Sequence, residues 1–215
     1  MKADQQLKSY GTTSDWTSRR LIDCTSNGIV SYGIVQPGRN KNGGVPIVRV
    51  NNFANGRLDV SEHLSVESSI EAKFERTRLK GGEVLLTLVG SVGQTAIVPK
   101  RMAGWNVARA VAVIRPSDEI GASWISLCLR SAQSQDFLDS RANTTVQKTL
   151  NLKDVREVLI PIPPRSIKDE IERVAVSIDR RMELCREVSE TLEAMAQALF
   201  KSWFVDFDPV IDNAL

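Results

Sequence analysis

A long stretch without Gly or Pro near the C-terminus constrains the fold more than any other feature of this sequence. Neither residue occurs from 165 to 208, and Ser166 can cap a helix that carries Asp169 and Glu170 in its first turn. The stretch predicts one helix of about 37 residues, extending about 55 Å at about 1.5 Å per residue.

The apolar residues of this helix fall on two positions of a seven-residue repeat. The first series is Ile171, Ile178, Cys185, Leu192 and Leu199, and the second is Ile167, Val174, Val188 and Met195, broken by Arg181 and Ser202. A helix this long, with a narrow apolar seam and charged flanks, rarely buries its seam alone. The pattern favours a partner helix, and the alternative is packing on the chain's own globular part.

The aromatic residues that end the helix point to a second contact. Residues 199–207 include Phe200, Trp203, Phe204 and Phe207. Such a cluster is either a plug in a core or a docking surface for another protein.

The net charge of +2 hides a division between two parts of the chain. Residues 166–215 hold 6 Lys/Arg and 11 Asp/Glu, which leaves 22 Lys/Arg and 15 Asp/Glu to residues 1–165. Three stretches contain cations and no acids: residues 24–58, 84–117 and 140–153. A basic surface of this kind suits phosphates, although chance clustering on a solvated surface is the plainer interpretation. The sequence divides into a basic domain, residues 1–165, and an acidic helix with its tail, residues 166–215.

The basic domain has the pattern of an α+β fold. Residues 1–20 read as a polar lead-in, and a glycine-rich stretch with a surface loop at residues 39–42 follows. Strands are predicted at residues 45–50, 84–89, 94–98, 110–114 and 158–160, the last closed by Pro161. Helical patterns occupy residues 65–76, with a start at Ser65 or Ser68, and residues 123–140, and residues 90–93 form a tight glycine loop at the tip of a hairpin.

The composition favours a cytoplasmic protein. No apolar run approaches the roughly 18 residues of a membrane span, and the N-terminus lacks the apolar core of a signal peptide. Three cysteines, far apart and odd in number, argue against a disulfide framework and for a reducing compartment.

No convincing catalytic or metal site emerges from the sequence. His63 is the only histidine, and the patterns GxSxG, GxGxxG and GxxxxGK[ST] are absent. Asp59, Glu71 and Lys73 faintly resemble a magnesium-dependent nuclease site, but three such residues arise easily on an exposed helix. A DNA amino-methyltransferase would need Asn or Asp before Pro-Pro, where this chain has Ile162. We expect no catalytic residue and no metal in this chain.

Several short segments, in this order and spacing, resemble the specificity subunit of type I restriction–modification systems. They are residues 33–38 (GIVQPG), 44–50 (GVPIVRV), 56–58 (GRL), 79–86 (LKGGEVLL), 90–94 (GSVGQ), 147–151 (QKTLN), 160–164 (IPIPP) and 198–207 (ALFKSWFVDF). One departure follows the Pro-Pro, where relatives often have Leu-x-Glu-Gln and this chain has RSIKDE at residues 165–170. The departure bears on capping of the helix rather than on DNA reading.

The resemblance implies an architecture and a set of partners. Such subunits usually have two target-recognition domains, each followed by a long helix, and the two helices pack antiparallel as a coiled coil. Each domain reads one half of a split sequence in double-stranded DNA. DNA adenine methyltransferase subunits dock beside them and bind S-adenosylmethionine, and a restriction subunit can join. This chain holds one domain and one helix, so it resembles a half-subunit that pairs with a second copy, or a fragment that pairs with a second half.

Candidate contacts follow from side-chain chemistry, since Arg, Asn and Gln pair with base edges and Lys and Arg with phosphates. For base contact the candidates are Arg39, Asn40, Asn42, Ser91, Gln94, Asn143, Thr144 and Gln147. For phosphate contact they are Lys41, Lys100, Arg101, Arg109, Arg141 and Lys148. For helix pairing and docking they are Ile171, Val174, Ile178, Cys185, Val188, Leu192, Met195, Leu199, Trp203 and Phe204.

Three functions from different classes stay open at this point. The first is a non-catalytic DNA-reading subunit without a cofactor of its own. The second is a metal-dependent nuclease that uses Asp59, Glu71 and Lys73. The third is a coiled-coil adaptor with no role on DNA.

Overall fold

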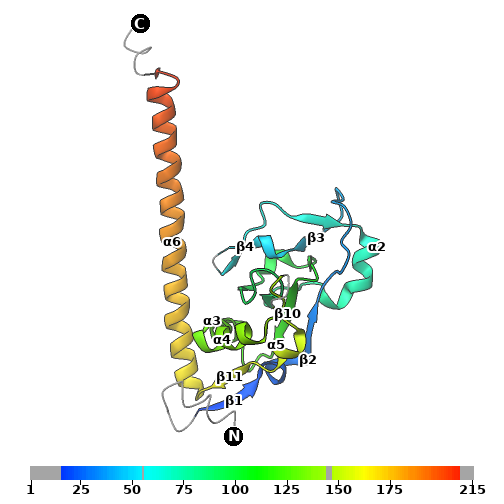
Figure 1. The fold of residues 1–215 in the computed structure, drawn as a ribbon. Coiled ribbons are helices and arrows are strands. Elements are labelled where there is room, and N and C mark those ends of the chain that lie inside the picture. The colour runs from blue at the N-terminus through cyan, green and yellow to red at the C-terminus, as the bar shows by residue number, and fades with distance from the viewer. Residues whose placement is uncertain (1–15, 55, 144–146, 209–215) are drawn as a thin grey trace. The chain divides into compact units, whose positions relative to one another are not determined.

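The computed structural model describes residues 16–54, 56–143 and 147–208. Contacts within the chain divide it into two compact units, residues 1–169 and 170–215. The first unit holds all the strands that the structure describes, and the second continues the long helix α6 (Figure 1). The functional division expected after residue 165 stays a prediction.

A four-stranded antiparallel sheet is the largest in the first unit. Its order is β2 (Thr25–Tyr32), β10 (Val111–Pro116), β7 (Val84–Thr87) and β8 (Thr95–Ile97). All four residues of β7 and the first four of β10 are buried. These two strands were predicted from their apolar runs, and burial on both faces explains why those runs are continuous.

The register of this sheet gives it two distinct ends. At one end lie Tyr32, Arg109 and the loop of residues 88–94 that joins β7 to β8, which we call the tip end. At the other end lie Ser26, Glu83 and Arg115, which we call the far end. Strand β7, from Val84 to Thr87, spans three residue steps, or about 10 Å at about 3.4 Å per step.

A second sheet packs its own small core. Its order is β6 (Leu64–Val66), β3 (Val45–Val48) and β9 (Asn106–Val107), and β3 and β9 run parallel. Ile34, Ile47 and Val66 form the buried centre of this cluster. A two-stranded ribbon of β4 (Phe53–Ala54) and β5 (Arg57–Leu58) lies between β3 and β6 in the sequence. The strand predicted at residues 45–50 ends early, because Val50–Asn52 turn into the 3-10 helix η3.

The helix predicted at residues 65–76 begins at Ser68, the later of its two expected starts. Ser65 belongs to β6, and the helical part consists of α2 (Ser68–Glu71) and the 3-10 helix η4 (Ala72–Thr77). Phe74 has non-helical backbone angles, and its side chain packs on the core of Ile34, Ile47 and Val66.

Residues 17–20 are not a lead-in but a strand, which corrects the prediction. β1 (Thr17–Arg20) pairs antiparallel with β11 (Leu159–Ile162), and Thr17 lies opposite Ile162. Pro161 lies within β11 rather than closing it. A two-stranded ribbon tolerates Pro because one side of each strand needs no ladder hydrogen bond. The 3-10 helix η2 (Leu21–Cys24) then leads from β1 into β2.

The single helix predicted at residues 123–140 is two helices. α3 (Ala122–Arg130) and α4 (Ala132–Arg141) meet at Ser131, whose backbone is extended and whose Oγ accepts a hydrogen bond from the Ser134 amide at 3.3 Å. Trp124 of α3 is buried and donates its indole N–H to the Pro161 carbonyl at 2.8 Å. A short helix, α5 (Leu152–Arg156), follows.

Helix α6 runs from Arg165 to Phe204 without interruption, 40 residues in all. It begins one residue before the expected cap, because the amides of Ile167 and Lys168 both donate to the Pro164 carbonyl. Ser166 therefore lies inside the first turn. The prediction of an α+β unit followed by one long helix is confirmed, while pairing of that helix as a coiled coil stays a prediction. No helix in the described part of the chain has the length and apolar character that crossing a membrane requires.

Candidate nucleic-acid interface

The loop at the tip end is held by the buried side chain of Thr87. Its hydroxyl donates to the Ser91 carbonyl and accepts from the Gln94 amide at 3.0 Å. The amide of Gly93 donates to the Thr87 carbonyl at 3.1 Å. Gly93 has a φ of +91°, which favours glycine, and an added Cβ would lie 2.6 Å from Gln135. The loop is thus fixed in one conformation by its own strand.

A segment distant in sequence completes the tip end. The amide of Gly90 donates to the Lys148 carbonyl at 2.9 Å, and that of Leu150 to the Leu88 carbonyl at 2.8 Å. Val89 and Asn143 each form a bridge with Thr149. Gln135 of α4 adds two hydrogen bonds from its Nε2, to the carbonyls of Gly93 and Leu129.

The structure brings four predicted base-contact residues together at this end. Ser91, Gln94, Asn143 and Gln147 are exposed, and Gln147 lies over Gly90, within 3.5 Å of the place a Cβ would take. Within residues 16–143 and 147–208, the side chains of these four make none of the recorded hydrogen bonds. Their hydroxyl and amide groups are therefore open to an outside partner. Thr144 lies outside the described residues.

The loop at residues 39–42 is exposed as predicted, but Asn40 has a structural task. Its Oδ1 accepts a hydrogen bond from the Ser65 amide at 2.9 Å, and the Lys41 amide donates to the Ser65 carbonyl. A bidentate contact with adenine needs both the oxygen and the nitrogen of the amide. Asn40 therefore offers a base its nitrogen and only one lone pair of its oxygen while this bond lasts. Arg39 and Asn42 stay exposed beside it.

The predicted phosphate contacts divide into groups with different surroundings. Lys148 Nζ lies 2.7 Å from Asp139, and Arg141 stacks on Phe137 at 5.4 Å from the ring centroid. Part of the charge of Lys148 is therefore already compensated. Arg109 is exposed at the tip end, where its amide donates to the Ile34 carbonyl. Lys41 is exposed in its own loop.

Lys100 and Arg101 lie at the far end, apart from the base-contact candidates. They belong to the 3-10 helix η5 (Lys100–Met102), which follows β8. A Cβ on Gly81 would lie 2.8 Å from the Lys100 Cα, so η5 packs directly on the turn at residues 80–82. The β7–β8 ladder separates this group from the loop of residues 88–94.

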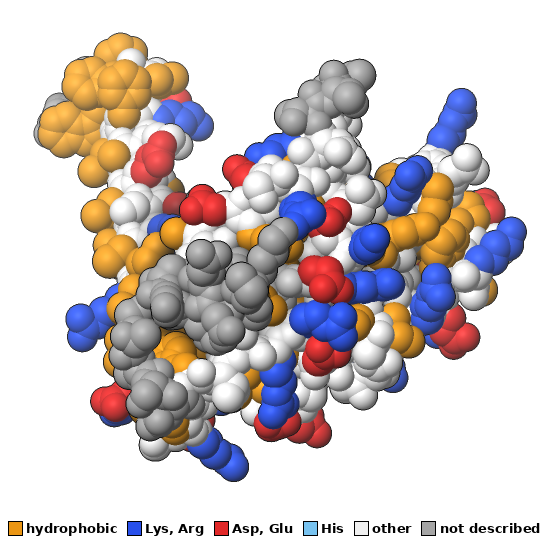
Figure 2. Space-filling view, turned by 60° about the horizontal axis from the view of Figure 1, so that its bottom comes forward, with side chains coloured by type: hydrophobic (Ala, Val, Ile, Leu, Met, Phe, Trp, Pro, Cys, Tyr) orange, Lys and Arg blue, Asp and Glu red, His pale blue; other side chains and the backbone are white. Residues whose placement is uncertain are grey.

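A basic pocket at the far end was missed by sequence reasoning. It measures about 470 Å³ and is lined by Ser26, Asn27, Glu75, Arg76, Arg78, Leu79, Lys80 and Arg115. The residues come from β2, η4, β10 and the turn before β7, so their meeting depends on the fold. Acids at Glu71, Glu75 and Glu83 hid the cluster from a search for acid-free stretches. Figure 2, which brings the lower side of Figure 1 forward, shows Lys and Arg side chains mixed with Asp and Glu there.

The residues of the nuclease hypothesis have other tasks. Glu71 is buried and binds Arg78 and Asn106, while the Asp59 carboxylate accepts hydrogen bonds from the amide and hydroxyl of Ser61. The hydrogen bond from Arg78 lowers the pKa of Glu71, and the Ser61 hydrogen bonds lower the pKa of Asp59. Lys73 is exposed. Over the described residues, no three His, Cys, Asp or Glu side chains form a group that suits a metal ion.

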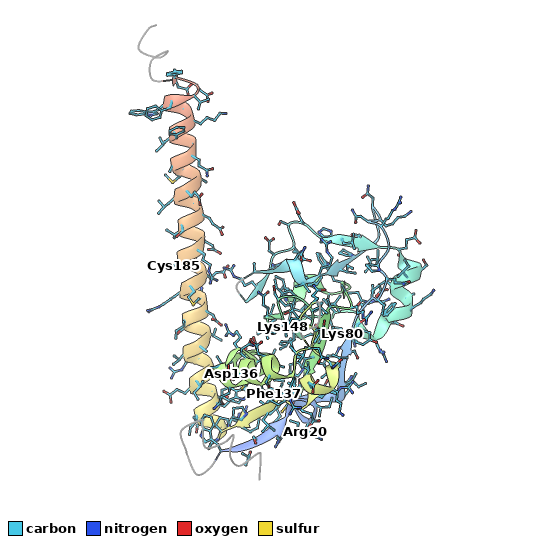
Figure 3. All side chains as sticks on the ribbon, in the orientation of Figure 1. Arg20, Lys80, Asp136, Phe137, Lys148 and Cys185 are labelled. Atoms are coloured by element: carbon cyan, nitrogen blue, oxygen red, sulfur yellow. The ribbon has the colours of Figure 1, made fainter. Side chains whose placement is uncertain are left out.

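The apolar face of α6 is wider than the expected seam. The predicted pairing residues are mostly half-exposed, among them Leu192 at 59% and Leu199 at 60%. Met182 and Leu184 lie beside the two repeat positions, Val176, Phe200 and Phe204 lie farther round the helix, and all five are exposed as well. Cys185 lies about half way along the helix (Figure 3). The charged flanks expected beside the seam are therefore interrupted by apolar residues.

Over the described residues, the chain thus consists of an α+β unit with exposed polar loops and a long helix whose apolar residues are largely exposed. Residues 26–194 match the family described as the type I restriction modification DNA specificity domain. The chain belongs to this family.

Curated relatives agree with this assignment. The specificity subunit of the type I restriction enzyme EcoBI from Escherichia coli is 32% identical over 143 residues, which cover 66% of this chain and 30% of the relative. The specificity subunit of HindI from Haemophilus influenzae is 31% identical over 138 residues, covering 61% and 30%. The chain thus matches less than a third of the length of these two relatives.

Solved structures share the fold at low sequence identity. The specificity subunit from M. genitalium has a TM-score of 0.60 at 13% identity, over 90% of this chain and 47% of that one. The HsdS subunit from Thermoanaerobacter tengcongensis has a TM-score of 0.58 at 18% identity, over 94% and 50%.

Proposed function

We propose that this chain reads one half of a bipartite sequence in double-stranded DNA for a type I restriction–modification enzyme. The observation that carries the proposal is the fixed loop at the tip end, which presents Ser91, Gln94 and Gln147 with unused hydrogen-bonding groups. Side chains held by a rigid scaffold lose little entropy on binding base edges. Arg109 at the same end supplies a charge for the adjacent phosphates.

The chemistry belongs to partner chains in this proposal. DNA adenine methyltransferase subunits bind S-adenosylmethionine and modify the adenine, and a restriction subunit joins the complex. This chain then has no catalytic residue and no cofactor of its own. The nuclease alternative receives no support from Asp59, Glu71 and Lys73, since two of them are engaged with other side chains.

The long helix pairs with a second copy or a second half and docks the methyltransferase. Its half-exposed apolar residues extend beyond the two seam positions, so one partner helix leaves part of the face uncovered. Trp203 and Phe204 at its C-terminal end are 58% and 62% exposed, and aromatic residues of this kind anchor protein interfaces.

The decisive experiment is co-expression with the partner methyltransferase, followed by mapping of the methylated adenines. A split motif supports the proposal, and a palindromic one identifies a pair of identical copies. Gln94→Ala and Gln147→Ala are expected to relax the motif at single positions, whereas Gln197→Ala on α6 leaves it unchanged. Unaltered methylation patterns in both Gln94→Ala and Gln147→Ala would indicate that other residues contact the bases. Absence of DNA binding by the assembled complex would favour the adaptor hypothesis.

A further inference from the structure

The pocket at the far end contains two kinds of cation. Arg78 is committed, since it binds Glu71 through two contacts of 2.9 and 2.6 Å and Glu75 at 3.2 Å. Arg115 is committed too, donating to the carbonyls of Arg76 and Arg78 at 2.8 and 3.0 Å. Its Nε lies 3.7 Å from the Glu83 carboxylate. These two arginines build the wall of the pocket.

Arg76 and Lys80 are the pocket cations whose side chains bind no other described residue. Both side chains are exposed, and neither has a recorded hydrogen bond or ion pair in the described part of the chain. Their backbone is nevertheless fixed: the Arg76 carbonyl accepts from Arg115, and the Lys80 amide donates to Glu83 Oε1 at 2.8 Å. The pocket therefore presents two charges on a rigid base, beside the neutral polar groups of Ser26 and Asn27.

The basic surface continues beyond the pocket. The Lys80–Gly81 turn packs on η5, which carries Lys100 and Arg101, and both of these side chains are exposed. Four exposed cations thus come from two segments in contact. The base-contact candidates of the loop at residues 88–94 lie beyond the other end of the β7–β8 ladder.

We propose that the pocket binds a phosphodiester of the DNA backbone, with Arg76 and Lys80 as the contacting residues. The inference rests on the proposed function and adds a contact that carries no sequence information. An open pocket with long cationic side chains and one hydroxyl and one amide suits phosphate oxygens, which accept from any direction. An acidic protein segment is the competing ligand, and the experiment separates the two.

The test uses the complex of this chain with its methyltransferase partner. Binding of a target duplex and a scrambled duplex is followed by fluorescence anisotropy at several salt concentrations. For the double variant Arg76→Gln/Lys80→Gln we expect an equal loss of affinity for both duplexes. The slope of log K against log salt should fall in magnitude by about 0.9 for one lost phosphate contact. Lys73→Gln is the matched control, an exposed cation of η4 that does not line the pocket.

Each other outcome overturns the inference. An unchanged salt slope, or a loss confined to the target duplex, excludes a backbone phosphate at this pocket. Unchanged DNA affinity with loss of the methyltransferase during purification assigns the pocket to an acidic protein surface. Failure of the wild-type complex to bind either duplex removes the proposed function itself. Since neither side chain has a partner in the described residues, thermal unfolding of the double variant should match the wild type, which checks its folding.

Discussion

Arg78 binds the buried carboxylate of Glu71 through two hydrogen bonds. Its Nε donates to Oε1 at 2.9 Å, and its Nη2 donates to Oε2 at 2.6 Å. Glu71 Oε1 also accepts from Asn106 Nδ2 at 2.9 Å, and Asn106 Oδ1 accepts from the Thr77 hydroxyl. This network ties α2 and η4 to β9. The buried charge of Glu71 is therefore compensated by groups from two other segments of the first unit, Arg78 after η4 and Asn106 in β9.

Arg78→Met is expected to lower the free energy of unfolding by about 2 kcal/mol, because it leaves Glu71 buried without its charge partner. Urea unfolding at neutral pH measures the loss. Lys73→Met, a change of the same kind at an exposed site of η4, should cost less than about 0.5 kcal/mol. Equal stabilities of the two variants would contradict a structural role for the pair.

Acid should weaken the same network. Because the pKa of Glu71 is lowered in the folded state, its contribution is complete above the ordinary value of 4.5 and is lost as the pH falls through the folded value. Unfolding free energies measured from about pH 7 down to about pH 3 should decline more steeply for the wild type than for Glu71→Gln. Parallel profiles would show that this carboxyl has no depressed pKa.

Gln135→Ala should loosen the loop of residues 88–94, because Gln135 Nε2 links the Gly93 carbonyl of that loop to the Leu129 carbonyl of α3. We expect a stability loss of about 1 kcal/mol and faster amide exchange at Gly93 and Gln94. Asp136→Asn, at the next and exposed position of α4, serves as control. Unchanged exchange in the loop would show that Gln135 does not hold it.

Leu192→Glu should prevent association through α6, since a charge at the centre of the apolar face is costly to bury. Light scattering with size-exclusion chromatography measures the assembly state of the co-expressed complex. Ala194→Glu adds the same charge away from the repeat positions and should assemble normally. Assembly by both variants would exclude the seam as the pairing surface.

Cys185 should be the first thiol to react in the native chain. It is exposed, whereas Cys24 and Cys128 are buried, and burial raises the pKa of the Cys24 thiol to about 11. A maleimide reagent is expected to label one site in the native protein and three in denaturant. Labelling should slow on assembly if the apolar face of α6 is covered, and equal rates would place Cys185 outside the interface.

Sequence patterns were sufficient for elements with a strong internal signal. The apolar runs of β7 and β10 and the uninterrupted repeat of α6 marked these elements directly. Strands β1 and β2 were not predicted because Ser18, Arg19, Ser26 and Asn27 are polar. These two strands depend on pairing with β11 and β10, respectively. The break at Ser131 also escaped, since neither Gly nor Pro marks it.

The candidate site could be predicted from the sequence only in part, for a similar reason. The tip loop and residue 147 were chosen for their side chains, and folding placed them together. The compensation of Lys148 by Asp139 depends on where α4 ends, which no local pattern reveals. Arg76 and Lys80 line the pocket together with Ser26, which lies about 50 residues earlier in the sequence. Only the folded chain brings these segments together.

The pairing of β1 with β11 brings the first and last strands of the described part of the first unit together, with Thr17 opposite Ile162. A unit whose ends are adjacent can be joined to another of its kind without a long connection, at little cost in loop entropy. The pairing of β1 with β11 thus allows the segment between these two strands to be exchanged as one unit. Under the proposed function, exchange of this segment would change the DNA preference and leave the helix that follows unaltered.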